Sequence, residues 1–169
     1  DEANPTPDQV DKIAAALTFE SDPEVLSQGI SSAARFPAPL ALRLLTLISQ
    51  HDVIRSSPDF ERVLWWAIEP FYAAHPDRVL ALLTELVTAH PDAPLPALAE
   101  FAMRRMANAG TKSDLQRCAK LLSFTDHPAW ESPLVTGFEA AFKGRSMAGL
   151  PPRLITALAN TSQPPTSLL

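Results

Sequence analysis

The sequence has little cysteine and little glycine, and both shortages exclude classes of site. Cys118 is the only cysteine, so no internal disulfide can form, and it belongs to neither a CxxC nor a CxxCH motif. The five glycines are dispersed, which excludes a glycine-rich loop that cradles phosphate, and no serine lies in a GxSxG pattern. Cys118 shares helical spacing with Leu115, Leu121 and Leu122, so we expect a small core residue rather than a nucleophile.

Basic tracts and long apolar runs are also missing. The net charge is −5 and the pI is about 5.3, which argues against a surface for nucleic acid or for anionic membranes. No apolar run reaches the roughly 18 to 20 residues that span a bilayer, so we expect no membrane insertion. The chain lacks a signal peptide and an initial methionine, which leads us to expect a mature form or a piece of a longer protein.

What the sequence does contain is typical of packed helices. Hydrophobic residues make up 46% of the chain, enough for a continuous core, and alanine and leucine outnumber the strand-forming valine and isoleucine. Most of the 17 prolines lie between segments of helical periodicity, where they separate elements. We therefore predict an all-α protein with a flexible leader at 1–7, a single domain at 8–160 and a tail or linker at 161–169.

About nine helices, each of roughly 10 to 17 residues, follow from the apolar periodicity, and no segment shows strand-like alternation. The expected ranges are 8–19, 21–36, 40–50, 58–76, 77–89, 94–110, 111–124, 134–144 and 151–160. The cap residues that we expect are Asp8, Ser21 or Asp22, Ser57 or Asp59, and Ser113 or Asp114, with Gly110 as a left-handed stop. Short loops between apolar helices predict an irregular HEAT-like stack of antiparallel hairpins, with a compact orthogonal bundle as the alternative.

The segment 58–76 is the expected centre of the fold, because Trp65, Trp66 and Tyr72 fall within one helical stretch. Its apolar surface is broad enough for burial between two neighbours. Glu69 lies inside this aromatic belt, and Pro70 should bend or break the helix. We interpret Glu69 as a structural acceptor that needs a partner, with a role as acid or base as the alternative.

The basic residues and histidines support binding or structural roles rather than catalysis. Arg104 and Arg105 are the arginines that could pair with Glu69 or hold an acidic partner near the belt. Of the four histidines, those at 75, 90 and 127 precede proline, so we expect their imidazoles at helix ends near the final carbonyls rather than at a metal. Trp130 is expected in a connecting loop, as a lid over a groove or as a plug at the end of the stack.

Four segments carry a resemblance to a known family. They are VLWWAIEP at 63–70, HPDRVLALL at 75–83, MRRMANAGTKSDLQRCAKLL at 103–122 and GFEAAFKGR at 137–145. Over about residues 36–153 the chain resembles the HEAT-like helical segment of large multidomain bacterial proteins. In that family it joins a membrane-bound-dehydrogenase-like or sugar-dehydrogenase-like β-propeller to a haem-binding cytochrome c domain with a CxxCH motif. This resemblance implies a connecting module exported to the periplasm. Neither propeller nor CxxCH is present, so haem binding and dehydrogenase activity do not carry over.

The sequence thus predicts a non-catalytic helical-repeat interaction or spacer module of a larger protein, with no cofactor, no metal and no catalytic residue. Its partners would be neighbouring domains of the parent chain or another protein, and the cytoplasm stays open as a location. The candidate anchor or binding residues are Trp65, Trp66, Glu69, Tyr72, Arg104 and Arg105. The alternative is a small-ligand or peptide-binding domain that uses the aromatic belt around Pro70, and an enzyme would depend on Glu69 alone.

Overall fold

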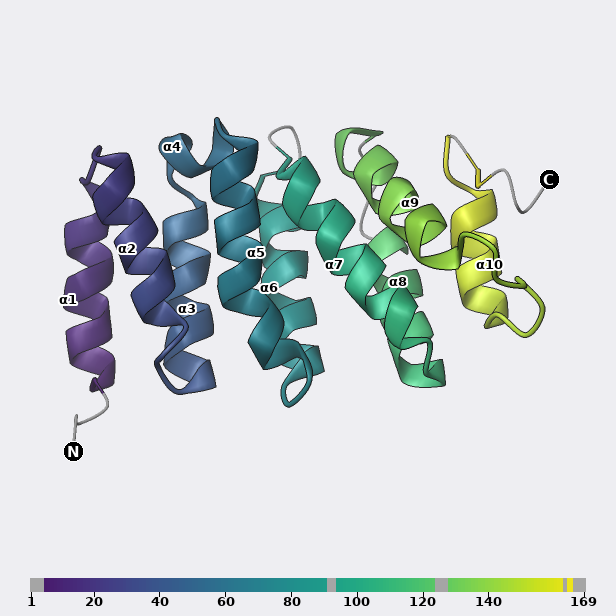
Figure 1. The fold of residues 1–169 in the computed structure, drawn as a ribbon, viewed down its shortest axis with the longest axis horizontal. Helices are drawn as coiled ribbons and strands as arrows, with labels where there is room; N and C mark the ends of the chain where they lie inside the picture. The colour runs from purple at the N-terminus through teal and green to yellow at the C-terminus, as the bar shows by residue number, and fades with distance from the viewer. Residues whose placement is uncertain (1–4, 91–93, 124–127, 163, 166–169) are drawn as a thin grey trace. The chain divides into compact units, whose positions relative to one another are not determined.

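Every regular element that the computed structural model describes is an α-helix, within residues 5–90, 94–123, 128–162 and 164–165 (Figure 1). These residues contain ten helices: α1 (Pro7–Thr18), α2 (Pro23–Ala33), α3 (Ala38–Ser49), α4 (Asp52–Arg55), α5 (Pro58–Tyr72), α6 (Pro76–Ala89), α7 (Pro96–Ala109), α8 (Lys112–Ser123), α9 (Pro128–Phe142) and α10 (Pro152–Ala159). The predicted all-α class is confirmed. The helix beyond the nine expected is α4, a single turn in the connection between α3 and α5.

Proline marks the start of most of these helices. Seven of the ten have proline as their first residue, namely α1, α2, α5, α6, α7, α9 and α10. At this position the missing N–H would have had no partner inside the helix, and the fixed φ of proline suits the first turn. Four helices have a proline in the first turn and a cap residue whose side chain makes no hydrogen bond to the helix. They are α3, α5, α7 and α10.

The predicted cap residues are correct for α2 and α7 and wrong for α1 and α8. At α5 the predicted Ser57 occupies the cap position without a side-chain hydrogen bond. Asp22 caps α2, where its Oδ1 accepts the backbone N–H of Glu24 at 2.8 Å. Gly110 ends α7 with a φ of 66°. Asp8 does not cap α1, because Thr6 does so in a reciprocal capping box with Gln9.

Two helices continue through prolines: at Pro70 the sequence predicted a bend or a break, and at Pro133 it predicted a loop. α5 continues beyond Pro70 to Tyr72, and α9 starts six residues before the predicted Leu134 and contains Pro133. Pro70 and Trp66 are both exposed, so water can hydrogen-bond the carbonyl that Pro70 leaves without a backbone donor. A proline near a solvated helix end therefore need not interrupt the helix.

The chain divides into two compact units, Asp1–Leu82 and Leu83–Leu169, and the division falls within α6. The single domain over 8–160 stays a prediction. In the first unit, α3 packs against α1, α2, α4 and α5, and Figure 1 shows α2 and α5 in front of it. The side chains that these helices bury most completely include Leu26, Ile30, Leu44, Leu45, Ile54, Leu64 and Ile68. Arg43 of α3 adds an ion pair with Asp11 of α1 at 2.8 Å.

The second unit is built on close contact between α7 and α9, and α8 packs against both α7 and α10. Figure 1 shows α7 and α9 in front of α8. Gly137 is buried in α9 where it meets the backbone of Glu100 in α7. Phe138 and Phe142 stack with their ring centroids 4.6 Å apart, and the guanidinium of Arg145 lies 4.6 Å from the centroid of the Phe142 ring. This tight α7–α9 pair leaves α8 and α10 as the second layer of the unit.

Candidate functional site

The predicted aromatic belt is divided between the core and the surface. Trp65 and Tyr72 are buried, at 4% and 3% exposure, whereas Trp66 is 62% exposed and Glu69 is half-buried. Neighbouring residues on a helix point about 100° apart, so α5 cannot bury both indoles against the same layer. The expectation that the paired indoles share one packed centre is therefore wrong for Trp66, and the belt offers a ligand one exposed indole.

The two predicted arginines lie on α7, where Arg104 is exposed and Arg105 is half-buried. Glu69 belongs to the first unit and both arginines belong to the second. The pairing of Glu69 with Arg104 or Arg105 therefore stays a prediction.

A different carboxylate on α5 is the deeply buried one. Glu61, in the first turn of the helix, is 2% exposed, and the sequence analysis did not single it out. Glu61 precedes Leu64, Trp65 and Ile68 by three, four and seven residues, which places it on the buried face of the helix. That spacing was the signal by which its burial could have been recognised.

The environments of Cys118, His51 and His75 indicate structural roles for these residues. Cys118 is fully buried, and burial, followed by the charge of Asp114, raises the pKa of its thiol to about 12. His51 caps α4 by accepting the backbone N–H of Val53 on Nδ1 at 3.4 Å. His75 uses its backbone N–H to reach the carbonyl of Phe71 at 2.8 Å. His127 lies outside the described residues, among which no group of three or more His, Cys, Asp and Glu could hold a metal.

Trp130 is neither a lid nor a plug, because it belongs to the buried face of α9. It is 2% exposed, and its indole Nε1 donates to the carbonyl oxygen of His90 at 3.0 Å. His90 follows α6 directly, so this bond ties the end of α6 to the first turn of α9. The predicted loop position was wrong because the prolines at 128 and 133 lie inside a helix rather than around it.

The second unit has a groove of about 900 Å³ between α8 and α10, which Glu131 of α9 also lines. We call it the α8–α10 groove. Its lining residues are Gln116, Ala119, Lys120, Leu122, Ser123, Glu131, Pro152, Arg153, Thr156, Ala157, Asn160 and Thr161. A neighbouring hollow of about 640 Å³ shares Gln116, Pro152 and Arg153 and reaches Lys112 at the start of α8. The two hollows together follow the whole length of α8.

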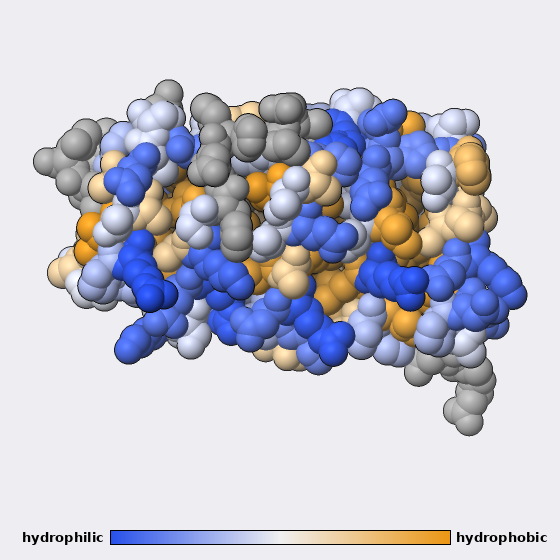
Figure 2. All heavy atoms as spheres, turned by 180° about the vertical axis from the view of Figure 1, so that it is seen from behind, coloured by the Kyte–Doolittle hydropathy of each residue, from blue (hydrophilic) through white to orange (hydrophobic). Residues whose placement is uncertain are grey.

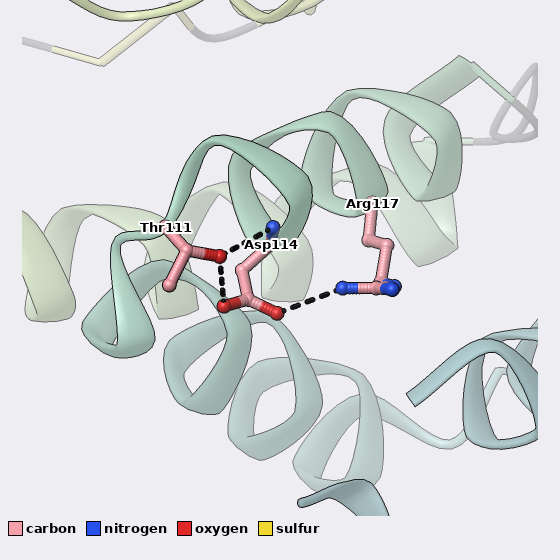
Figure 3. Close-up of polar contacts among 3 residues, drawn as sticks. All are labelled: Thr111, Asp114 and Arg117. Atoms are coloured by element: carbon pink, nitrogen blue, oxygen red, sulfur yellow. Dashed lines mark hydrogen bonds and ion pairs between the residues drawn. The ribbon is translucent and has the colours of Figure 1, made fainter. Parts of the chain in front are cut away.

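The start of α8 is held by a polar cluster of three residues (Figure 3). The hydroxyl of Thr111 accepts the backbone N–H of Asp114 at 3.1 Å and donates to Asp114 Oδ2 at 2.5 Å. Asp114 Oδ1 lies 3.0 Å from Arg117 Nη1, and both side chains are largely buried. Thr111, rather than the predicted Ser113 or Asp114, is thus the residue whose side chain caps α8. This cluster fixes the helix that forms one wall of the groove.

Glu131 lines the groove and hydrogen-bonds the segment that follows α10. Its Oε1 accepts the backbone N–H of Ser162 at 2.6 Å and also the Ser162 hydroxyl. Thr161 is buried and donates to the carbonyl of Leu158 at 2.7 Å. The first two residues of the predicted tail are therefore part of the packed structure.

The cations at the groove are available to a ligand. Lys112, Lys120 and Arg153 are exposed, and among the described residues none of their side-chain nitrogens has an ion-pair or hydrogen-bond partner. The remaining charged lining residue is Glu131, whose carboxylate already accepts from Ser162. Sequence reasoning missed this set, although Lys112, Gln116 and Lys120 at four-residue spacing indicate one face of a helix.

Exposed apolar side chains are scattered rather than gathered at the groove. The large ones are Ile13, Phe19, Val25, Leu47, Trp66 and Ile155, on five different helices or their ends, and Phe19 is 90% exposed. Seen from behind, the surface shows apolar patches among hydrophilic side chains (Figure 2). Single apolar residues of this kind are ordinary on a protein surface and mark no site by themselves.

No protein-family model, curated protein or solved structure matches the chain. Within the described residues, no helix is both long enough and apolar enough to cross a bilayer.

Proposed function

We propose that this chain is a non-catalytic helical-repeat module that serves as an interaction surface or spacer in a larger multidomain protein. One observation supports it above the others: each unit arranges successive helices in two layers. In the first unit α2 and α5 pack against each other and on α3, and in the second α7 packs on α9 while α8 packs on α10. Alternation of successive helices between two layers is the pattern by which helical hairpins stack into arrays.

Small-angle X-ray scattering of the purified chain tests the stacked arrangement. A compact bundle of 169 residues would have a radius of gyration of about 15 Å. We expect a clearly larger value and an asymmetric distance distribution, because stacked hairpins extend along one axis. A value at the compact figure would favour the orthogonal bundle. Saturable turnover on a broad substrate panel would contradict a non-catalytic role.

An exported, periplasmic parent protein is the second part of the proposal, and it is supported by the resemblance of VLWWAIEP at 63–70 and the three other segments alone. The full open reading frame of the gene provides the test. A propeller-like region upstream and a CxxCH segment downstream would support a connecting module. A reading frame that encodes these residues without either neighbour would contradict this part.

Peptide or small-ligand binding is the alternative function, and the α8–α10 groove favours it more than the aromatic belt does. Trp65 and Tyr72 are buried, so the belt presents only Trp66 to a ligand. The groove, by contrast, combines a volume of about 900 Å³ with cations that have no described partner. A volume of this size is typical of binding pockets.

A further inference from the structure

The α8–α10 groove carries an excess of positive charge on a chain whose net charge is −5. Lys112, Lys120 and Arg153 line the two connected hollows, and Glu131 is the one carboxylate among the lining residues that the structure describes. We propose that this groove binds an acidic peptide segment of a partner protein. The proposal rests on the proposed function, since it names the kind of partner that the interaction module would take.

The cations lie along the groove rather than at one point. Lys112, Gln116 and Lys120 follow one face of α8 at intervals of four residues, and Arg153 faces them from α10. From the start to the end of α8 the groove runs for about 16 Å, given the helical rise of 1.5 Å per residue. An extended peptide rises by about 3.3 Å per residue, so about five residues fit along it. Successive carboxylates along such a peptide would each form an ion pair with one of the cations.

The floor and the polar walls also suit a peptide. Ala119 and Ala157 are small residues from the facing helices, and Leu122 adds a buried apolar surface. Gln116 and Asn160 have amide groups that can both donate to and accept from a peptide backbone. The groove can therefore hold a backbone and small apolar side chains while its cations bind acidic ones.

The same features favour an acidic peptide over a nucleic acid. Among the described residues that line the two hollows none is aromatic, so these residues offer bases no surface on which to stack. The overall negative charge of the chain would repel a long polyanion, whereas a short peptide would meet the local positive charge first.

A direct binding measurement tests the proposal. The probe is a fluorescein-labelled peptide of Asp, Glu and Leu, long enough to span the groove, and its binding to the full chain is followed by fluorescence anisotropy. A matched peptide has Gln for each Glu and Asn for each Asp. We expect saturable binding of the acidic peptide that weakens with added salt, and at least roughly tenfold weaker binding of the amide peptide.

The groove variant is Lys112→Gln, Lys120→Gln and Arg153→Gln in one chain. All three positions are exposed, so the helical circular dichroism and the unfolding midpoint should stay close to those of the wild type. We expect the Kd for the acidic peptide to rise roughly tenfold or more, because each lost ion pair contributes a modest share that adds across the set.

A second variant has the same net charge but leaves the groove intact. It is Arg35→Gln, Arg78→Gln and Lys143→Gln, at exposed positions outside the lining of both hollows. We expect its Kd to stay within about twofold of the wild type. Equal weakening in the two variants would overturn the proposal, because the attraction would then come from overall charge.

Three further results would also overturn it: no saturable binding by the wild type, equal binding of the acidic and amide peptides, or tighter groove-dependent binding of a single-stranded oligonucleotide. None of them affects the scattering profile. An elongated chain that binds no acidic peptide would support the helical-repeat module and contradict only the acidic partner. A compact chain that binds the peptide would contradict the stacked module and support the acidic partner.

Discussion

Gly137 and Glu100 bring the backbones of α9 and α7 into direct contact. A methyl group at Gly137 would lie 2.3 Å from the carbonyl oxygen of Glu100, and 3.0 Å from its carbonyl carbon. Neither atom belongs to a flexible side chain that could turn away. The α7–α9 pair at the centre of the second unit therefore depends on the absence of a side chain at position 137.

We expect Gly137→Ala to lower the free energy of unfolding by about 1 to 3 kcal/mol, since the added methyl group forces the two helices apart. Urea denaturation followed by circular dichroism measures the change. Gly29→Ala is the matched control, because its added methyl group would lie 2.9 Å from Leu17 Cδ1, 3.4 Å from Leu17 Cδ2 and 3.7 Å from Ile48 Cδ1, which are the ends of side chains that can rotate. The gain in helix propensity should leave that variant close to neutral. Equal losses in the two variants would contradict the backbone contact.

Trp130→Phe should also reduce stability, by about 1 to 3 kcal/mol, because it removes the indole donor to the His90 carbonyl from a buried site. The measurement is the unfolding midpoint in urea. Trp66→Phe is the control, and we expect a change within about 0.5 kcal/mol, since Trp66 is 62% exposed. A larger loss at Trp66 than at Trp130 would show that the placement of the two indoles is reversed.

Thr111→Ala should cost about 1 kcal/mol, because the hydroxyl of Thr111 accepts the Asp114 N–H at the start of α8. Thermal unfolding measures this loss. Thr136→Ala changes an exposed threonine in the interior of α9 and should be neutral or slightly stabilising. If Thr111→Ala were equally neutral, the cluster in Figure 3 would contribute nothing to the helix start.

The thiol of Cys118 predicts a loss of stability in alkali. Its pKa is raised to about 12 in the folded chain, while the thiol of an unfolded chain has a pKa of about 8.5. Above the unfolded value the unfolded chain releases this proton and the folded chain keeps it, so the free energy of unfolding falls as the pH rises from about 9 to 12. The slope from this group is at most about 1.4 kcal/mol per pH unit.

Cys118→Ala isolates this contribution, because the other alkaline groups are common to both proteins. We expect the stability difference between wild type and variant to shrink between about pH 8 and pH 10. A thiol-reactive dye should label the folded wild type far more slowly than the unfolded chain, since the thiolate is the nucleophile. Rapid labelling under native conditions would contradict the buried position.

The helical class and most apolar faces could be predicted from local periodicity, and the errors have a common origin. The segment around Trp65 and Trp66 is apolar on several faces, so its periodicity does not decide which indole is buried. The two prolines around Trp130 indicate a loop, yet Pro128 occupies the first helical position, which suits proline, and α9 continues through Pro133. Both decisions depend on the layers that pack against the helix, which local sequence does not encode.

The candidate groove could not be predicted for the same reason. The spacing of Lys112, Gln116 and Lys120 places them on one face of α8, but Arg153 lies some thirty residues later, on α10. Only the packing of α8 on α10 brings these residues to one groove. Glu131 joins them through its hydrogen bonds to Ser162, a contact between residues that are 31 positions apart.

Proline in the first helical turn has a consequence for the conditions under which these helices persist. A carboxylate cap is sensitive to protonation and to dissolved ions, whereas the ring of proline fixes its backbone angle covalently. α3, α5, α7 and α10 rely on proline without a side-chain cap. The first turns of these four helices should therefore keep their helical conformation from acidic to neutral pH and at high salt concentration. This should hold even where surface ion pairs, such as that of Lys12 with Asp8, are screened.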